Sequence, residues 1–369
     1  MRRSPLHDLL ARSGVSFAER FGIEVATAAA DPATEYRRVR DTVGITDFSY
    51  AQVFRVPEQT GVDLLDGMVA GNVARVRYGR VLHTFAADSD GMLMADCYVA
   101  NNDDELVVVC ESIAGDAAMR GMFMAGAAAG AGVTDLNATH AVVGVDGFKA
   151  WAVMKELFGA DVLGLPYLSI EVFQFEGERV RLLRAGKTSE FGYLLIVPVA
   201  AAGALFARAL ESAQRQGGGL CGAAVHDALR LEGRFFNVFA EGARVRDPLP
   251  LGLQWMIDFG KEQFTGRDAI HARRAAGVTR KVVGIADENG KAGLTPGLAV
   301  YDGTAKVGEV VAACHSWVLG CDVGLAMLPA EIAYSGLPFT AGAAGGPALK
   351  TVSMPPIMPR SLTVRLDEL

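Results

Sequence analysis

The stretch DGMLMADCYVANNDDELVVV, residues 90–109, places one acid in the middle of an apolar run. In an extended chain Asp96 and Tyr98 share one face, because side chains alternate with a period of two. Residues 101–105 (NNDDE) are typical of a turn, and the apolar residues 106–110 predict a buried returning strand. A buried carboxylate is costly unless it is paired or hydrogen-bonded. Asp96 is therefore either an edge-strand residue facing water or a functional group.

The composition limits the classes of protein that the chain can be. Its 369 residues exceed the usual size of one domain and suggest two or three. With 51% hydrophobic and 21% charged residues the chain is globular, and its net charge of −7 argues against nucleic acid or an anionic membrane as the main partner. The first residues (MRRSPLHDLLARSG) lack the apolar core of a secretory signal. No uncharged apolar run reaches membrane-spanning length without Gly or Pro.

The cysteines and histidines give no sign of a metal centre. The five cysteines are scattered and form no CxxC pair, a pattern that fits reduced thiols and a cytoplasmic protein. Only residues 313–321 (ACHSWVLGC) bring Cys and His together, and zinc ligands usually show tighter paired spacing. We therefore expect no metal site.

The apolar pattern divides the chain into a mixed part and an all-β tail. Helices are predicted over residues 33–43, 61–73, 115–132, 148–159, 201–219 and 222–235. Strands are predicted over residues 44–56, 140–147 and 193–199, with a hairpin over residues 170–186. The tail adds strands over residues 280–288, 298–316, 323–329 and 347–355, the second of them with an Asp-Gly turn. This order indicates an α+β fold rather than a doubly wound parallel sheet.

Six segments, taken in order, resemble blocks of the glycine cleavage system T protein (aminomethyltransferase) and its folate-dependent demethylase relatives. The segments are EYRRVRDTVGITDFSYAQVFRV (35–56), YGRVLHTFAADSDGMLMADCYV (78–99), GKTSEFGYLLIVP (186–198), HDALRLEGRFF (226–236), DPLPLGLQWMIDFGKEQFTGRDAI (247–270) and GEVVAACHSWVLGCDVGLAML (308–328). The resemblance covers roughly residues 33–353. It rests on the order and spacing of the blocks rather than on any one of them.

The resemblance implies an α+β fold of three domains, arranged like a cloverleaf around a central ligand channel. The first domain would be discontinuous, formed by residues 1–47 and 142–258. The second, residues 48–141, would be inserted into it and carry Asp96, and residues 259–369 would form the C-terminal all-β domain.

The resemblance also implies an enzyme that transfers a one-carbon unit to tetrahydrofolate. The substrate would be a small amine or an N-, O- or S-methylated compound, and a lipoyl carrier protein would be a partner only within a glycine cleavage system. Asp96 aligns with the acid near N5 of the folate, where we expect burial to raise its pKa. The K-G-C-[YF]-x-G-Q-E motif of the iron–sulfur assembly relatives does not occur, which argues against a non-enzymatic role.

Six further positions carry over to the folate site. Leu82 and Val109 align with aliphatic residues that pack against the pterin, Ala51 aligns with a common Met, and Glu190 matches an acid of the G-[YF]-T-G-E motif. Core packing alone would also explain Leu82 and Val109. Lys187 stands where the family has Tyr, and Leu194 stands where it has the acid that reads the pterin donors.

The helix over residues 222–235 raises a second hypothesis. His226 stands where the family has a folate-contacting Arg, and its ordinary pKa near 6.5 suits a general acid or base. The same fold could therefore bind another small molecule and perform acid–base chemistry with Asp96 and His226; a non-catalytic binding protein is the third alternative. Asp227 and Arg230 are i,i+3 neighbours, and with Glu232 they favour a structural ion-pair network.

Overall fold

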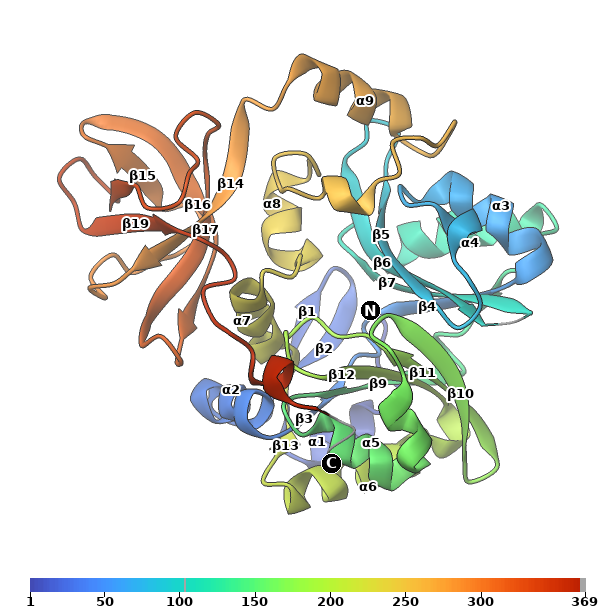
Figure 1. Ribbon diagram of the computed structural model, residues 1–369. Helices are drawn as coiled ribbons and strands as arrows, with labels where there is room; N and C mark the ends of the chain where they lie inside the picture. The colour runs from blue at the N-terminus through green and yellow to red at the C-terminus, as the bar shows by residue number, and fades with distance from the viewer. Residues whose placement is uncertain (103, 366–369) are drawn as a thin grey trace.

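The computed structural model describes residues 1–102 and 104–365, and these form three lobes around a central region (Figure 1). In Figure 1 the barrel of the C-terminal part lies on one side, a sheet with α3 and α4 lies on the other, and a second sheet with α5 and α6 lies below. Helix α7 (Ala223–Gly233) lies between them. No helix among the described residues is both long and apolar enough to span a membrane.

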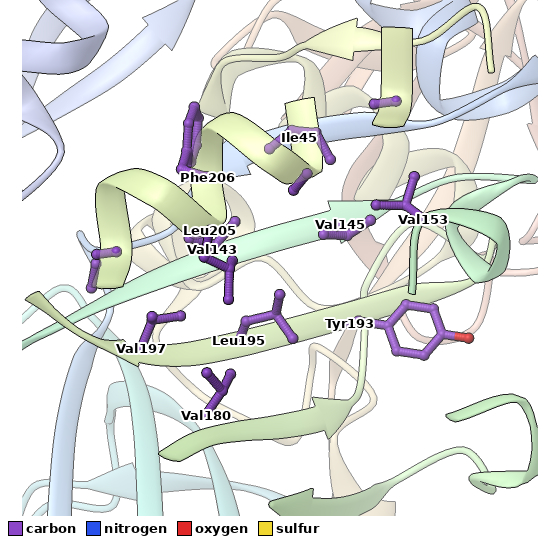
Figure 2. Packing of buried hydrophobic residues seen from close by; sticks show 14 of the residues in the cluster. Ile45, Val143, Val145, Val153, Val180, Tyr193, Leu195, Val197, Leu205 and Phe206 are labelled. Atoms are coloured by element: carbon purple, nitrogen blue, oxygen red, sulfur yellow. The ribbon is translucent and has the colours of Figure 1, made fainter. Parts of the chain in front are cut away.

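The lower lobe is a six-stranded sheet in the order β10-β11-β12-β9-β3-β13. Its strands are β3 (Gly44–Asp47), β9 (His140–Asp146), β10 (Ser169–Phe175), β11 (Glu178–Arg184), β12 (Gly192–Pro198) and β13 (Gly219–Leu220). Two helices, α5 (Ala150–Phe158) and α6 (Val199–Arg215), pack on one face. Leu205 and Phe206 of α6 meet Val143 and Leu195 of the strands (Figure 2), because apolar residues recur along α6 with helical spacing.

The upper lobe is a five-stranded sheet in the order β5-β6-β7-β4-β8. Its strands are β4 (Gln52–Pro57), β5 (Val81–Ala87), β6 (Leu93–Asn102), β7 (Glu105–Ser112) and β8 (Thr134–Asp135), and its helices are α3 (Glu58–Met68) and α4 (Asp116–Ala128). The predicted hairpin is β6–β7, and Asp103 of its turn lies outside the described residues. Ala95, Cys97 and Val99 belong to the core under α3 and α4, so the opposite face of β6 turns toward the lower lobe.

The C-terminal lobe is a closed barrel in the order β14-β17-β16-β15-β18-β19. Its strands are β14 (Arg280–Asp287), β15 (Ala299–Asp302), β16 (Ala305–Ser316), β17 (Cys321–Pro329), β18 (Pro338–Ala341) and β19 (Ala348–Val352), and α9 (Arg267–Ala276) precedes them. The predicted α+β fold with an all-β C-terminal domain is confirmed.

The expected strand over residues 44–56 is wrong as a single element. The structure divides it into β3 and β4, which belong to different sheets, and the turn between them carries Phe48 and Ala51 across the gap between the lobes. The remaining elements are α1 (His7–Arg12), β1 (Ser16–Arg20), β2 (Ile23–Ala28), α2 (Pro32–Asp41), α8 (Ala243–Val245) and short 3₁₀ or π turns at Val73–Arg75, Ala160–Gly164, Val238–Gly242, Gln254–Met256 and Arg360–Thr363.

Candidate functional site

A pocket lies where β6 and β7 of the upper sheet face β9 and β12 of the lower sheet, with α7 beside them. Its apolar wall consists of Phe48, Ala51, Tyr98, Val109, Val142 and Leu194. Its polar groups are Asp96, Glu111, Asp146, Lys187, His226 and Arg230. The enclosed space is about 30 Å³, which holds one or two water molecules.

Asp96 is fully buried and is held between two other side chains. Its Oδ1 lies 2.7 Å from Nε2 of His83, and its Oδ2 accepts a hydrogen bond of 2.5 Å from Nζ of Lys187. Burial by itself raises the pKa of Asp96, but Lys187 and then His83 outweigh it and hold the pKa below its ordinary value. The expected rise of this pKa is therefore wrong, because the expectation did not include these two partners.

Lys187 links Asp96 to a second buried acid, Glu111. The two acids are opposite each other on β6 and β7, an arrangement that destabilises a sheet unless a cation lies between them. Lys187 Nζ lies 2.5 Å from Glu111 Oε2, and Arg230 donates to both oxygens of Glu111, at 2.5 and 2.9 Å. Although burial raises the pKa of Glu111, Arg230 and Lys187 together hold it well below its ordinary value. We call the series His83–Asp96–Lys187–Glu111–Arg230 the buried charge chain.

Helix α7 carries ion pairs, but Asp227 and Arg230 do not pair with each other among the described residues. Arg230 pairs with Glu111 of β7, whereas Asp227 pairs with Arg20 of β1 at 2.8 Å. Glu232 accepts hydrogen bonds from Arg40 and Tyr36, each at 2.7 Å. The predicted network therefore ties α7 to three other elements, and its arginine belongs to the pocket.

His226 lies in the pocket wall in a neutral form. Its Nε2 lies 2.9 Å from Oγ1 of Thr46, and its ring packs edge-on against Phe48 at 4.8 Å. Burial, with Arg230 as the next cause, lowers the pKa of His226 to about 3. At neutral pH this imidazole is therefore uncharged. It can accept or donate a hydrogen bond, but it cannot act as a cationic general acid.

Two of the predicted cofactor positions lie outside the pocket. Leu82 lies in a separate groove beside Trp255, because it is opposite Val99 and so shares the face that packs on the helices. Its neighbour His83 is opposite Tyr98 and faces Asp96 instead. Glu190 binds the backbone N–H and the hydroxyl of Ser361, at 3.0 and 2.5 Å, and so anchors the C-terminal segment. Ala51, Val109, Lys187 and Leu194 do line the pocket.

The sequence analysis missed His83, Glu111 and Asp146. Asp146 is the last residue of β9 and is 2% exposed. Burial raises its pKa to about 7, although Arg230 and Thr188 act in the opposite direction. Its signal in the sequence was the same as that of Asp96, an acid in an apolar strand (HAVVGVDG, residues 140–147).

A lower sheet and an inserted upper sheet that face each other across an acid-lined pocket, followed by a C-terminal barrel, define a fold of the aminomethyltransferase type. The crystal structure of the glycine cleavage system aminomethyltransferase T from Bartonella henselae matches with a TM-score of 0.81 at 20% identity, over 97% of this chain and 99% of that one. Residues 6–261 match the GCVT N-terminal domain family, and residues 280–358 match the glycine cleavage T-protein C-terminal barrel domain. The chain therefore belongs to the glycine cleavage T-protein family and is an enzyme.

Relatives in sequence agree with this assignment. The aminomethyltransferase of Mycobacterium bovis is 28% identical over 331 residues, covering 89% of this chain and 88% of the relative. That of a Synechococcus species is 28% identical over 338 residues, covering 91% of this chain and 93% of the relative.

The chemistry of the pocket fits the tetrahydrofolate that the family implies. Carboxylates can accept from the N–H groups of a pterin. Nε of Arg230 is buried and has no hydrogen-bond partner among the described residues, so it can donate to a carbonyl oxygen. The apolar wall suits the faces of a ring.

Proposed function

We propose that this chain is a tetrahydrofolate-dependent one-carbon transferase, moving an aminomethyl or methyl group from a small amine or methylated compound. The observation that carries the proposal is Asp96, a fully buried carboxylate that lines an apolar-walled pocket in a chain of this family. Within a glycine cleavage system the amine would arrive on a lipoyl carrier protein.

Folate, when bound, would supply the nitrogen that accepts the one-carbon unit. Phe48, Val109 and Leu194 would pack against its ring, and the free Nε of Arg230 would donate to it. These contacts would exclude water from the reacting group, which would strengthen the electrostatic interactions in the pocket.

Asp96 would act as a proton acceptor and as a fixed negative charge. Because Lys187 and His83 hold its pKa low, it is ionised at neutral pH and has no proton to donate. Nε2 of His83 lies 2.7 Å from Oδ1 of Asp96, and because an ionised carboxylate can only accept, this nitrogen donates its hydrogen to Asp96 and fixes the orientation of the carboxylate. A carboxylate near a nitrogen that becomes positively charged stabilises that charge, most strongly in a dry pocket.

Two measurements test the proposal. Titration calorimetry measures the binding of tetrahydrofolate, and a turnover assay compares the rate of Asp96→Asn with that of the wild-type protein. We expect folate to bind the wild-type protein, and the variant to bind it while losing about 100-fold or more in turnover, the usual contribution of a positioned acid–base group. Asp47→Asn is the matched control, since Asp47 is a buried acid of β3 outside the pocket. If the wild-type protein does not bind tetrahydrofolate at millimolar concentration, the proposal is wrong.

A second candidate is acid–base chemistry on another small molecule, without folate, using Asp96 and His226. The small enclosed space and the closed pairing of Asp96 with Lys187 favour it. Under this candidate the protein turns over its substrate with no folate present. A strict requirement for folate in the same assay contradicts it.

A further inference from the structure

The remaining acid of the pocket, Asp146, occupies a space that two glycines leave for it. Asp146 is opposite Gly192 of β12 in the sheet. A Cβ on Gly192 would lie 2.8 Å from Oδ1 of Asp146, and one on Gly186 would lie 2.9 Å from the same atom. Neither position has room for a side chain, because a Cβ would collide with the backbone of the other glycine and with this carboxylate.

Asp146 differs from the other two pocket acids in its partners. Asp96 pairs with Lys187, and Glu111 pairs with Lys187 and Arg230. Among the described residues Asp146 forms no ion pair, and its polar partner is the hydroxyl of Thr188. The titratable and charged groups around it are Arg230 and His226 of α7, Lys187, Glu111 of β7, Asp96 of β6, Tyr167 and Cys221.

We propose that Asp146 is the residue of this pocket that receives a hydrogen bond from an N–H group of the ligand and exchanges a proton with the solvent when the ligand binds. The proposal deepens the proposed function, and it rests on that function only in taking this pocket as the ligand site.

The charges of the pocket define the class of ligand. Asp96 and Glu111 are balanced by Lys187 and Arg230, and His226 is neutral. Asp146 adds one uncompensated negative charge when it ionises. A protonated amine would restore the balance, so a cationic nitrogen that carries at least one N–H is the ligand that this carboxylate fits.

Binding of such a cation is coupled to a proton. The ligand favours the ionised carboxylate, so R–NH₃⁺ and the neutral acid form the ion pair R–NH₃⁺···⁻OOC and release one proton to water. Burial places the pKa of the free carboxyl at about 7. The affinity therefore rises by about ten-fold from pH 6 to pH 8, and at pH 7 about half a proton leaves per ligand bound. The amine itself stays protonated over this range.

Calorimetry with methylammonium chloride on the full chain tests the inference, at pH 6, 7 and 8 and in two buffers of different ionisation enthalpy. Tetramethylammonium, which has the same charge but no N–H, is the control ligand. Asp146→Asn keeps the shape of the side chain but cannot ionise, and Asp47→Asn is the control variant. Circular dichroism checks that both variants fold.

We expect the wild-type protein and Asp47→Asn to show the ten-fold rise and the proton release, and Asp146→Asn to show neither. When Asp146→Asn does not fold, the buffer comparison on the wild-type protein still tests the proton release, and its absence overturns the inference. A pH-independent affinity, a dependence that persists in Asp146→Asn, or no binding of methylammonium overturns the inference. Because the probe is not folate, a failure here differs from a failure of folate to bind.

Discussion

Arg230→Met tests whether the buried charge chain holds the upper sheet to α7. The Arg230 side chain is 3% exposed and donates to both oxygens of Glu111. In the variant Glu111 stays buried and shares Lys187 with Asp96, so one cation serves two carboxylates. Removal of one partner of a buried pair costs about 3–5 kcal/mol, because the other charge stays desolvated. We expect the free energy of unfolding to fall by that amount at pH 7.

The loss depends on pH, and its sign follows from Glu111. The wild-type protein holds the pKa of Glu111 well below its ordinary value, so this group stabilises the fold at every pH above its unfolded pKa. Without Arg230 the pKa of Glu111 rises, and protonation relieves the stranded charge as the pH falls. The difference between the wild-type protein and the variant is therefore largest near pH 7 and shrinks toward pH 4.

Urea unfolding followed by tryptophan fluorescence at pH 7 and pH 5 measures this difference. Arg215→Met is the matched control, since Arg215 also pairs with two glutamates but is 48% exposed, and its loss should be about 0–1 kcal/mol. The double variant Arg230→Met/Glu111→Met should be more stable than Arg230→Met alone, because it removes the stranded acid. Equal losses for Arg230→Met and Arg215→Met would refute the reasoning.

Three further changes test other contacts. Lys187→Met removes the cation beside Asp96, so the pKa of Asp96 rises and the acidic limb of the activity–pH profile moves up by about one unit or more; an unmoved limb contradicts this. Tyr36→Phe removes a hydroxyl that donates to Glu232, so the free energy of unfolding measured with urea should fall by about 1.5–3 kcal/mol; an unchanged value would show that this hydrogen bond does not stabilise the fold. Glu190→Gln weakens the hold on Ser361, so trypsin should cleave after Arg360 several-fold faster, and an unchanged rate argues against the anchor.

The elements of the fold were largely predictable because they depend on local patterns. The period of two in residues 90–109 placed Asp96 and Tyr98 on one face, and the structure has them in the same pocket. The same alternation would have selected His83, which is opposite Tyr98, over Leu82. The aligned block pointed to Leu82, whereas the pairing of β5 with β6 places His83 beside Asp96.

The electrostatics of the site could not be predicted in this way. The pKa of Asp96 was expected to rise with burial, but Lys187, which is 91 residues away in the chain, reverses the direction. Arg230 of α7 and Glu111 of β7 are 119 residues apart in the chain. The spacing of residues in the sequence does not predict such long-range contacts between charged side chains.

The sequence by itself determined the strands, the helices, the α+β class with its all-β tail, and the family, since these follow from periodicity and from ordered motifs. Only the tertiary structure decided which acids are paired, which acid is left unpaired at Asp146, and which histidine faces Asp96. The physical reason is that side-chain direction is a local property of a strand, whereas the charge state of a buried group depends on the distances to charges that the packed lobes bring together.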